Sequence, residues 1–238
     1  MPQCREDASS LRYTHGMLFR VIHSVAVVFF LATLCQPTPA QVGKLYPVDE
    51  AHRDPSFFIF RARLLEAAQQ RDAEYTISIL SPGIRNGFGG NDGVAEFKKY
   101  WKPERPDSKL WKTLTRVLAL GGSFHSDTSF MAPYTYSKFP DEYDAFEHGV
   151  VVGENVRVRK QSAVESPVVA TLSFDIVKVK DWKPKQAAGS KQGWVNVLLK
   201  DGTSGYVAEE YIRGPVDYRA IFEKKDGRWQ LAAFVSGD

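Results

Sequence analysis

The chain has 238 residues, of which 43% are hydrophobic and 25% are charged, and its formal net charge is +3. This composition excludes an intrinsically disordered chain, and the small net charge excludes a strongly basic nucleic-acid binder. With two cysteines, the chain is neither a disulfide-dense scaffold nor a protein with a cysteine-ligated metal.

The N-terminal segment has the pattern of a secretory signal peptide. Residues 21–34 form an apolar run, VIHSVAVVFFLATL, which follows Arg20. This run is shorter than the roughly 20 residues that a membrane-spanning helix needs. Thr38 and Ala40 are the small residues expected before a cleavage site. We therefore predict a signal peptide over 1–40, cleaved after Ala40, and an exported, periplasmic protein without a stable membrane span after cleavage.

Two alternatives for this segment stay open. In the first, translation starts at Met17, because the sixteen polar residues before it would make an unusual leader. In the second, the apolar run is an uncleaved anchor helix. Cleavage removes Cys4 and Cys35 and leaves 28 basic against 26 acidic residues, a charge of +2. The mature chain then has no thiol, so it cannot use a cysteine nucleophile.

Residues 41–140 are expected to form a helix-rich α+β domain. Asp54 is a typical N-cap, and Pro55 fits the first turn of a helix because its missing N–H is not needed there. Apolar residues then recur at helical spacing, and a Ser-Pro-Gly break is expected at 81–83. The expected helices are 54–70, 72–79, 94–101 and 108–118, the last closed by a Gly-Gly pair.

From residue 149 the chain consists of short β-rich runs separated by turns, which is typical of a small barrel or sandwich. A tight hairpin is expected at 200–203, where the sequence reads KDGT, and a last hairpin is expected over 218–235. The predicted runs are 150–152, 156–158, 168–172, 176–179, 194–199 and 204–207.

Three stretches of this β-rich region carry a family pattern. Residues 153–159 read GENVRVR, residues 168–179 read VVATLSFDIVKV, and residues 193–212 read GWVNVLLKDGTSGYVAEEYI. On these motifs, residues 149–213 resemble a bacterial SH3 (SH3b) domain. The resemblance implies a small SH3-like β-barrel that follows the helix-rich domain and precedes a C-terminal β-hairpin.

The resemblance also implies a groove in which aromatic side chains receive an extended peptide. By matched position, the candidate ligand-binding residues are Trp182, Trp194, Tyr206 and Tyr211. A place in the core is the competing interpretation of each, and it is favoured for Trp194 and Tyr206. The chain departs from the family at 160–162, at Asp175 and in the enlarged loop 182–192, so the family's ligand is not carried over.

In the N-terminal region, the expected helices are followed by a Phe-Gly-Gly stretch at 88–90 and a further helix, and the chain ends in the hairpin sequence YRAIFEKKDGRWQLAAFVSGD. On these features, residues 45–135 faintly resemble the nuclear-transport-factor-2-like α+β domains. In that arrangement the hairpin within 215–238 completes the first domain, and the SH3-like segment is an insertion. A hairpin that is simply appended to the chain is the alternative.

The sequence contains no convincing arrangement of catalytic residues. The mature chain has three histidines, His52, His125 and His148, without zinc-ligand spacing. Ser123, His125 and Asp127 would share one face of a strand, whereas a triad needs Ser and Asp on opposite sides of the imidazole. The glycines at 87–93 lack a phosphate-loop ending, so we expect a sharp loop between helices with Asp92 as a helix cap.

These observations predict a non-catalytic binding or scaffolding protein of the cell envelope, without a cofactor, a metal or a nucleic-acid partner. The expected partner is a cell-wall peptide or an envelope protein. One alternative is a small-ligand or catalytic pocket in the first domain that uses Asp72, Asp92 or His125. Another is a protein–protein adaptor with an exposed apolar patch near Trp182.

Overall fold

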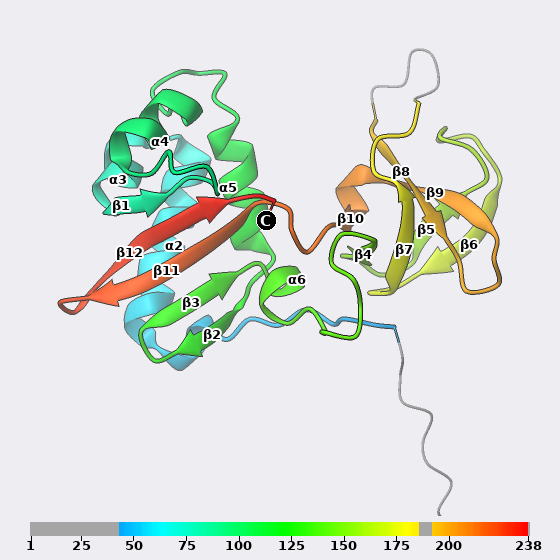
Figure 1. The fold of residues 1–238 in the computed structure, drawn as a ribbon, viewed down its shortest axis with the longest axis horizontal. Helices are drawn as coiled ribbons and strands as arrows, with labels where there is room; N and C mark the ends of the chain where they lie inside the picture. Colours follow the sequence, from blue (N-terminus) through cyan, green and yellow to red (C-terminus); the bar gives the residue numbers. More distant parts are fainter. Residues whose placement is uncertain (1–42, 186–191, 238) are drawn as a thin grey trace, which may run out of the picture. The chain divides into compact units, whose positions relative to one another are not determined.

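The structure is a computed structural model that describes residues 43–185 and 192–237 (Figure 1). The predicted signal peptide, both cysteines and part of the enlarged loop lie outside the described residues. Helices and strands both contribute substantially to the described chain, which confirms the mixed α+β class. The strands form two sheets.

The C-terminal hairpin occupies the middle of the first sheet. It consists of β11 (Arg219–Lys225) and β12 (Arg228–Val235). Strand β11 pairs antiparallel with β3 (Ser129–Ala132), which pairs with β2 (Ser123–Ser126). On the other side, β12 pairs parallel with β1 (Leu80–Arg85). The order β1-β12-β11-β3-β2 therefore joins strands from before and after the second sheet (Figure 1).

The helices of this region precede β2 or follow β3. Asp54 caps the longest one, because its carboxylate accepts hydrogen bonds from the backbone N–H groups of Ser56 (2.7 Å) and Phe57 (3.2 Å). The helical elements are η1 (Ala51–Arg53), α2 (Pro55–Gln70), α3 (Ala73–Ser78), α4 (Val94–Trp101), α5 (Leu110–Ala119) and α6 (Tyr134–Ser137).

An aromatic cluster around Phe57 joins α2 to the sheet. The Phe57 ring is fully buried, and its centroid lies 4.2 Å from that of Phe130 on β3. It also lies 5.4 Å from Phe222 on β11 and 4.8 Å from Trp229 on β12. Aromatic pairs at such distances add stability beyond that of burial alone. One helix residue therefore binds three neighbouring strands together.

The second sheet is antiparallel and has the order β10-β4-β7-β8-β9-β5-β6. Among the described residues no pairing joins β6 to β10, so the strands do not form a closed barrel, and the SH3-like architecture stays a prediction. The strands are β4 (His148–Val151), β5 (Val156–Arg159), β6 (Val168–Leu172), β7 (Ile176–Asp181), β8 (Trp194–Leu198), β9 (Ser204–Ala208) and β10 (Ile212–Arg213).

Alternating valines build the core of this sheet. Successive side chains of a strand point to opposite faces, so every second residue of a strand can face the interior. Val158, Val197 and Val207 come from three neighbouring strands and are fully buried. Gly205 lets two of these strands approach each other, since a Cβ at this position would lie 2.5 Å from Val158.

Two local expectations are wrong. The helix before Ser81-Pro82-Gly83 ends at Ser78, as expected, but the segment itself is not a loop. It lies within β1, at the edge of the first sheet, where proline is tolerated because one side of the strand needs no hydrogen bonds. Asp92 does not cap α4, because Gly93 is the N-cap and the Asp92 carboxylate accepts from the N–H of Asn86 at 3.1 Å. The glycine-rich loop therefore joins a strand to a helix rather than two helices.

Asp54 predicts a pH-dependent contribution to stability. Hydrogen bonds, first from the Ser56 hydroxyl and then from Lys224 and the helix N–H groups, lower the pKa of Asp54 from 3.8 to about 2. The ionised carboxylate thus stabilises the fold above pH 3.8, and this contribution is lost as the pH falls toward 2. We expect Asp54→Ala to lower the free energy of unfolding by about 1–2 kcal/mol at neutral pH.

Urea unfolding at neutral pH and near pH 2 measures this contribution. The difference between the wild type and Asp54→Ala should shrink at the acidic pH, and Asp54→Asn, which keeps an acceptor but no charge, should lose less stability than the alanine variant. An equal difference at both pH values would contradict the assignment.

Gly122 gives a second test, of the close approach between the α5–β2 connection and β3. A Cβ at Gly122 would lie 2.2 Å from the carbonyl oxygen of Met131 and 2.8 Å from the Phe130 ring. Because the backbone oxygen can move only if the strand shifts, Gly122→Ala should lower the free energy of unfolding in urea by about 2 kcal/mol or more. Gly83→Ala is the matched control, since nothing lies within 4 Å of its Cβ position. Similar losses in both variants would refute this account.

Candidate functional site

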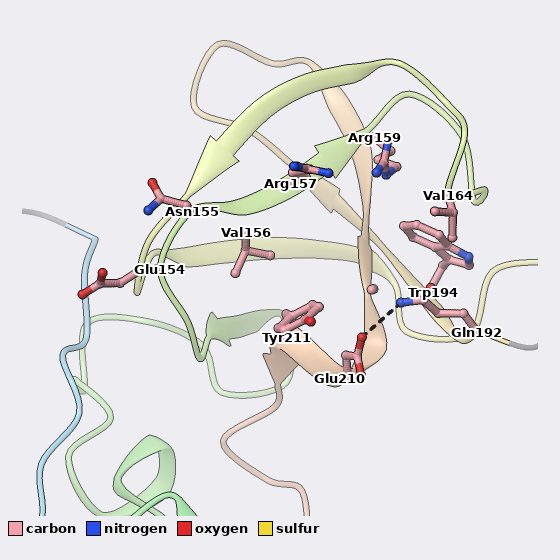
Figure 2. Close-up of a pocket in the computed structure, with 11 residues that line it drawn as sticks. Glu154, Asn155, Val156, Arg157, Arg159, Val164, Gln192, Trp194, Glu210 and Tyr211 are labelled. Atoms are coloured by element: carbon pink, nitrogen blue, oxygen red, sulfur yellow. Dashed lines mark hydrogen bonds between the residues drawn. The ribbon is translucent and has the colours of Figure 1, made fainter.

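A cavity of about 440 Å³ lies between β5, the start of β8 and the short helix η2 (Glu209–Tyr211) (Figure 2). The loop after β5 contributes Val164, and the end of β9 contributes Ala208. Its lining residues are Glu154, Asn155, Val156, Arg157, Arg159, Val164, Gln192, Trp194, Ala208, Glu210 and Tyr211.

Strand β5 presents two arginines to this cavity. Arg157 and Arg159 are two positions apart, so the strand period places both on one face, while Val158 between them faces the core. The Arg159 guanidinium donates to the carbonyl oxygen of Ser166 at 2.7 Å. Arg157 is exposed, and within the described chain neither arginine has an ion-pair partner. Both positive charges are therefore available to a ligand.

Acidic and aromatic side chains of η2 lie on the opposite side of the cavity (Figure 2). Tyr211 is 46% exposed, and Glu210 accepts a hydrogen bond from the Gln192 side chain at 3.3 Å. Glu154 adds a second exposed carboxylate at the start of β5. The cavity thus has guanidinium groups on one side and carboxylates at its other borders.

Close backbone contacts hold η2 in place. The N–H of Glu209 donates to the carbonyl oxygen of Gly193 at 2.9 Å, and the N–H of Val152 donates to that of Tyr211 at 2.9 Å. A Cβ at Gly193 would lie 2.0 Å from the Glu209 carboxylate, so glycine permits this approach. The exposed Tyr211 ring therefore stands on a fixed backbone.

Trp194 forms the buried end of the cavity wall. It is 3% exposed and opens β8. Its indole Nε1 is buried and has no hydrogen-bond partner among the described residues. Buried tryptophan N–H groups usually have a partner, because an unsatisfied donor costs free energy. Trp194 thus contributes a largely buried ring to the wall, and its indole N–H is an unsatisfied buried donor.

The other two aromatic candidates lie outside this cavity. Trp182 is half-buried and packs against the valine core of the second sheet, and its ring closely approaches the backbone of Gly149 and Gly214. Tyr206 is half-buried on β9, where it pairs with Asn196 and Arg159. The structure therefore brings together Trp194 and Tyr211 and separates both from Trp182.

Sequence reasoning did not single out the charged lining residues. The alternation in the VRVR run of 156–159 already places Arg157 and Arg159 on one face of a strand. That signal was present in the sequence. The position of Glu210 across the cavity depends on the packing of η2, which no local pattern specifies.

The Ser123, His125 and Asp127 set does not form a triad. A bulge between Phe124 and Ser126 interrupts the strand alternation, so Ser123 is buried and His125 is exposed. The shared face that we expected from a regular strand is therefore absent.

Asp72 and Asp92 both have local structural roles. The Asp72 carboxylate accepts from the N–H of Tyr75 at 2.9 Å and caps α3, and Asp92 holds the loop before α4 through Asn86. His125 lies exposed on a third element, β2. Within the described ranges, no three His, Cys, Asp or Glu side chains gather as a metal-binding group.

No helix in the described part of the chain has the length and apolar character that crossing a membrane requires. Comparison of the chain with protein-family models, with curated proteins and with solved structures finds no match.

The Arg159 hydrogen bond predicts a local change in dynamics. Arg159→Gln removes the donor to Ser166, so the loop 160–167 should open more often and its backbone amides should exchange faster in hydrogen–deuterium exchange. Arg157→Gln removes the same charge from the same face but no such hydrogen bond, so it serves as the control. Unchanged exchange in Arg159→Gln, or an equal increase in both variants, would contradict this role.

Proposed function

We propose that the protein is an exported, non-catalytic binding protein of the cell envelope, and that the cavity at Trp194 and Tyr211 holds an extended peptide. The single observation that carries the proposal is the arrangement of that cavity, with two aromatic rings on its wall and guanidinium and carboxylate groups on opposite sides. The SH3-like resemblance of 149–213 and the signal pattern of 1–40 support it.

The chemistry of the lining indicates the class of peptide. Arg157 and Arg159 offer charged donors to carboxylates, and Glu154 and Glu210 offer acceptors to an amine. The rings of Trp194 and Tyr211 offer apolar surface to the backbone and side chains of an extended peptide. A peptide with both free carboxylates and a free amino group matches these features, and the peptides of the bacterial cell wall are of this class.

A binding isotherm with insoluble cell wall tests the proposal. The full chain should be retained, and Tyr211→Ala should weaken retention about tenfold, because an exposed aromatic anchor typically contributes more than 1 kcal/mol to binding. Phe146→Ala is the matched control, since Phe146 is also an exposed aromatic residue, at 57%, but lies outside the cavity. Absence of retention at low salt, or equal retention of Tyr211→Ala and wild type, would refute the proposal.

A protein–protein adaptor is the second candidate function, and one observation favours it. Phe146 is exposed, and the Trp182 indole lies against its backbone, with Nε1 3.5 Å from the Phe146 carbonyl oxygen. Together they place two large apolar side chains at one surface. The same pair of variants separates the functions, because an adaptor surface loses its partner in Phe146→Ala and keeps it in Tyr211→Ala.

A further inference from the structure

The net charge of the chain is concentrated in one short segment. Residues 96–112 contain six Lys or Arg and three Asp or Glu, so their net charge is +3, which equals the formal charge of the entire chain. The remaining residues therefore sum to zero. This segment comprises most of α4, the loop that follows it and the start of α5.

Ion pairs within the segment neutralise half of its cations. Lys98 pairs with Glu104 at 3.1 Å, and Lys99 pairs with Glu96 at 3.3 Å. Arg105 makes a two-pronged contact with Asp107, at 2.9 Å and 3.1 Å. All three carboxylates are therefore engaged. Within the described residues, Lys102, Lys109 and Lys112 form no ion pair. Lys102 is near enough to Asp107 to help lower the pKa of that carboxylate, after the larger effect of Arg105.

Two of these lysines line a hollow of about 450 Å³. Lys102 and Lys109 lie at its border, and the Tyr100 ring, 66% exposed, forms part of its wall. The hollow is separate from the cavity at Trp194 and shares no lining residue with it. Its lining residues are Tyr100, Trp101, Lys102, Arg105, Asp107, Ser108 and Lys109.

The loop that carries the lysines is held by hydrogen bonds. The Ser108 hydroxyl donates to the carbonyl oxygen of Trp101 at 2.6 Å, and the N–H of Arg105 donates to that of Lys102 at 3.0 Å. Lys102 itself has a left-handed backbone with φ of 49°, a conformation that glycine adopts at lower cost. A charged side chain thus stands where the backbone favours glycine.

The positions of Lys109 and Lys112 are unfavourable in the free protein. Lys109 is the N-cap of α5, and the first turn of this helix has no acidic residue. The N-terminus of a helix carries partial positive charge and favours anions, so two lysines there repel it. An anion at the hollow would relieve this repulsion as well as that among the lysines.

From these features we infer that the surface formed by Tyr100, Lys102, Lys109 and Lys112 binds the anionic headgroups of a phospholipid membrane. The three free cations are all lysines, which suit an array of mobile phosphates, whereas recognition of one phosphate in fixed geometry uses the arginine fork. An exposed tyrosine beside them is the residue type that favours the membrane–water interface. A cluster of unpaired lysines binds anionic lipid with about 1 kcal/mol for each side chain.

This inference does not depend on the proposed peptide site and has its own test. The full chain is sedimented with vesicles of phosphatidylcholine alone and of phosphatidylcholine with phosphatidylglycerol. The neutral vesicles measure any binding through the apolar run of 21–34. We expect added affinity for the anionic vesicles, which should fall steeply between about 0.05 M and about 0.5 M salt because exposed charges are screened.

Variants locate the surface. Lys102→Gln with Lys109→Gln should lower the anionic-vesicle partition coefficient about 25-fold, since each lysine contributes about a factor of five. Lys180→Gln with Lys225→Gln makes the same change in net charge at two exposed lysines, on β7 and β11, and should change the partition coefficient little.

Four results would overturn the inference. The first two are equal binding of the chain to both vesicle types and an equal loss of binding in the two double variants. The third is release of the chain from anionic vesicles by inorganic phosphate beyond the release by chloride of equal ionic strength. The fourth is release by a single-stranded RNA that binds the chain more tightly than the vesicles do. The third result would assign the hollow to a free phosphate ligand, and the fourth would assign the surface to a nucleic acid.

Discussion

The pairing of the C-terminal hairpin with strands from the first half of the chain is the constraint on which the rest of the structure depends. Strands β11 and β12 form the middle of the first sheet, so β1 is joined to β3 and β2 only through residues 219–235. Phe57 then packs against Phe222 and Trp229 of this hairpin and joins α2 to it. The residues of the second sheet lie between two parts of the first sheet in the sequence, so both of their ends are fixed.

The return from β10 to the hairpin is itself tied to the fold. Arg213 is 4% exposed, and its guanidinium donates to the carbonyl oxygen of Tyr218. Burial lowers the pKa of Arg213 to about 10. Arg116 on α5 donates to the carbonyl oxygen of Glu209 at 2.9 Å, at the start of η2. The backbone that carries Tyr211 is therefore held from several sides, which keeps an exposed aromatic ring in a defined position.

Local patterns in the sequence predicted where helices and strands form better than they predicted which strands pair. The run of 168–172 forms β6 with the predicted bounds, and the Asp54-Pro55 start of α2 is present, because β-branched composition and helix capping depend on neighbouring residues. Strand β1 was missed, because Ser81, Pro82 and Gly83 favour a break locally, and β12, the strand that pairs with it, lies far along the chain.

The candidate sites show the same difference between local patterns, which the sequence reveals, and long-range packing, which it does not. Motif matching indicated Trp194 and Tyr211, and alternation alone was enough to place Arg157 and Arg159 on one face. The separation of Trp182 from the cavity follows from its packing beside Gly149 and Gly214, which no sequence pattern specifies. The basic segment 96–112 is visible in the sequence, but only the structure shows which of its lysines form ion pairs.

A peptide bound in the cavity at Trp194 and Tyr211 lies against the Trp194 ring, so the indole N–H resonance of Trp194 is a direct probe of binding. We would follow the indole ¹H–¹⁵N resonances of the labelled chain during titration with a soluble cell-wall peptide, and assign the Trp194 signal by its loss in Trp194→Phe. We expect a saturable shift of this resonance, because a peptide beside the Trp194 ring changes the magnetic environment of the indole. Saturable shifts confined to the other indole signals, or no shift at any concentration, would contradict it.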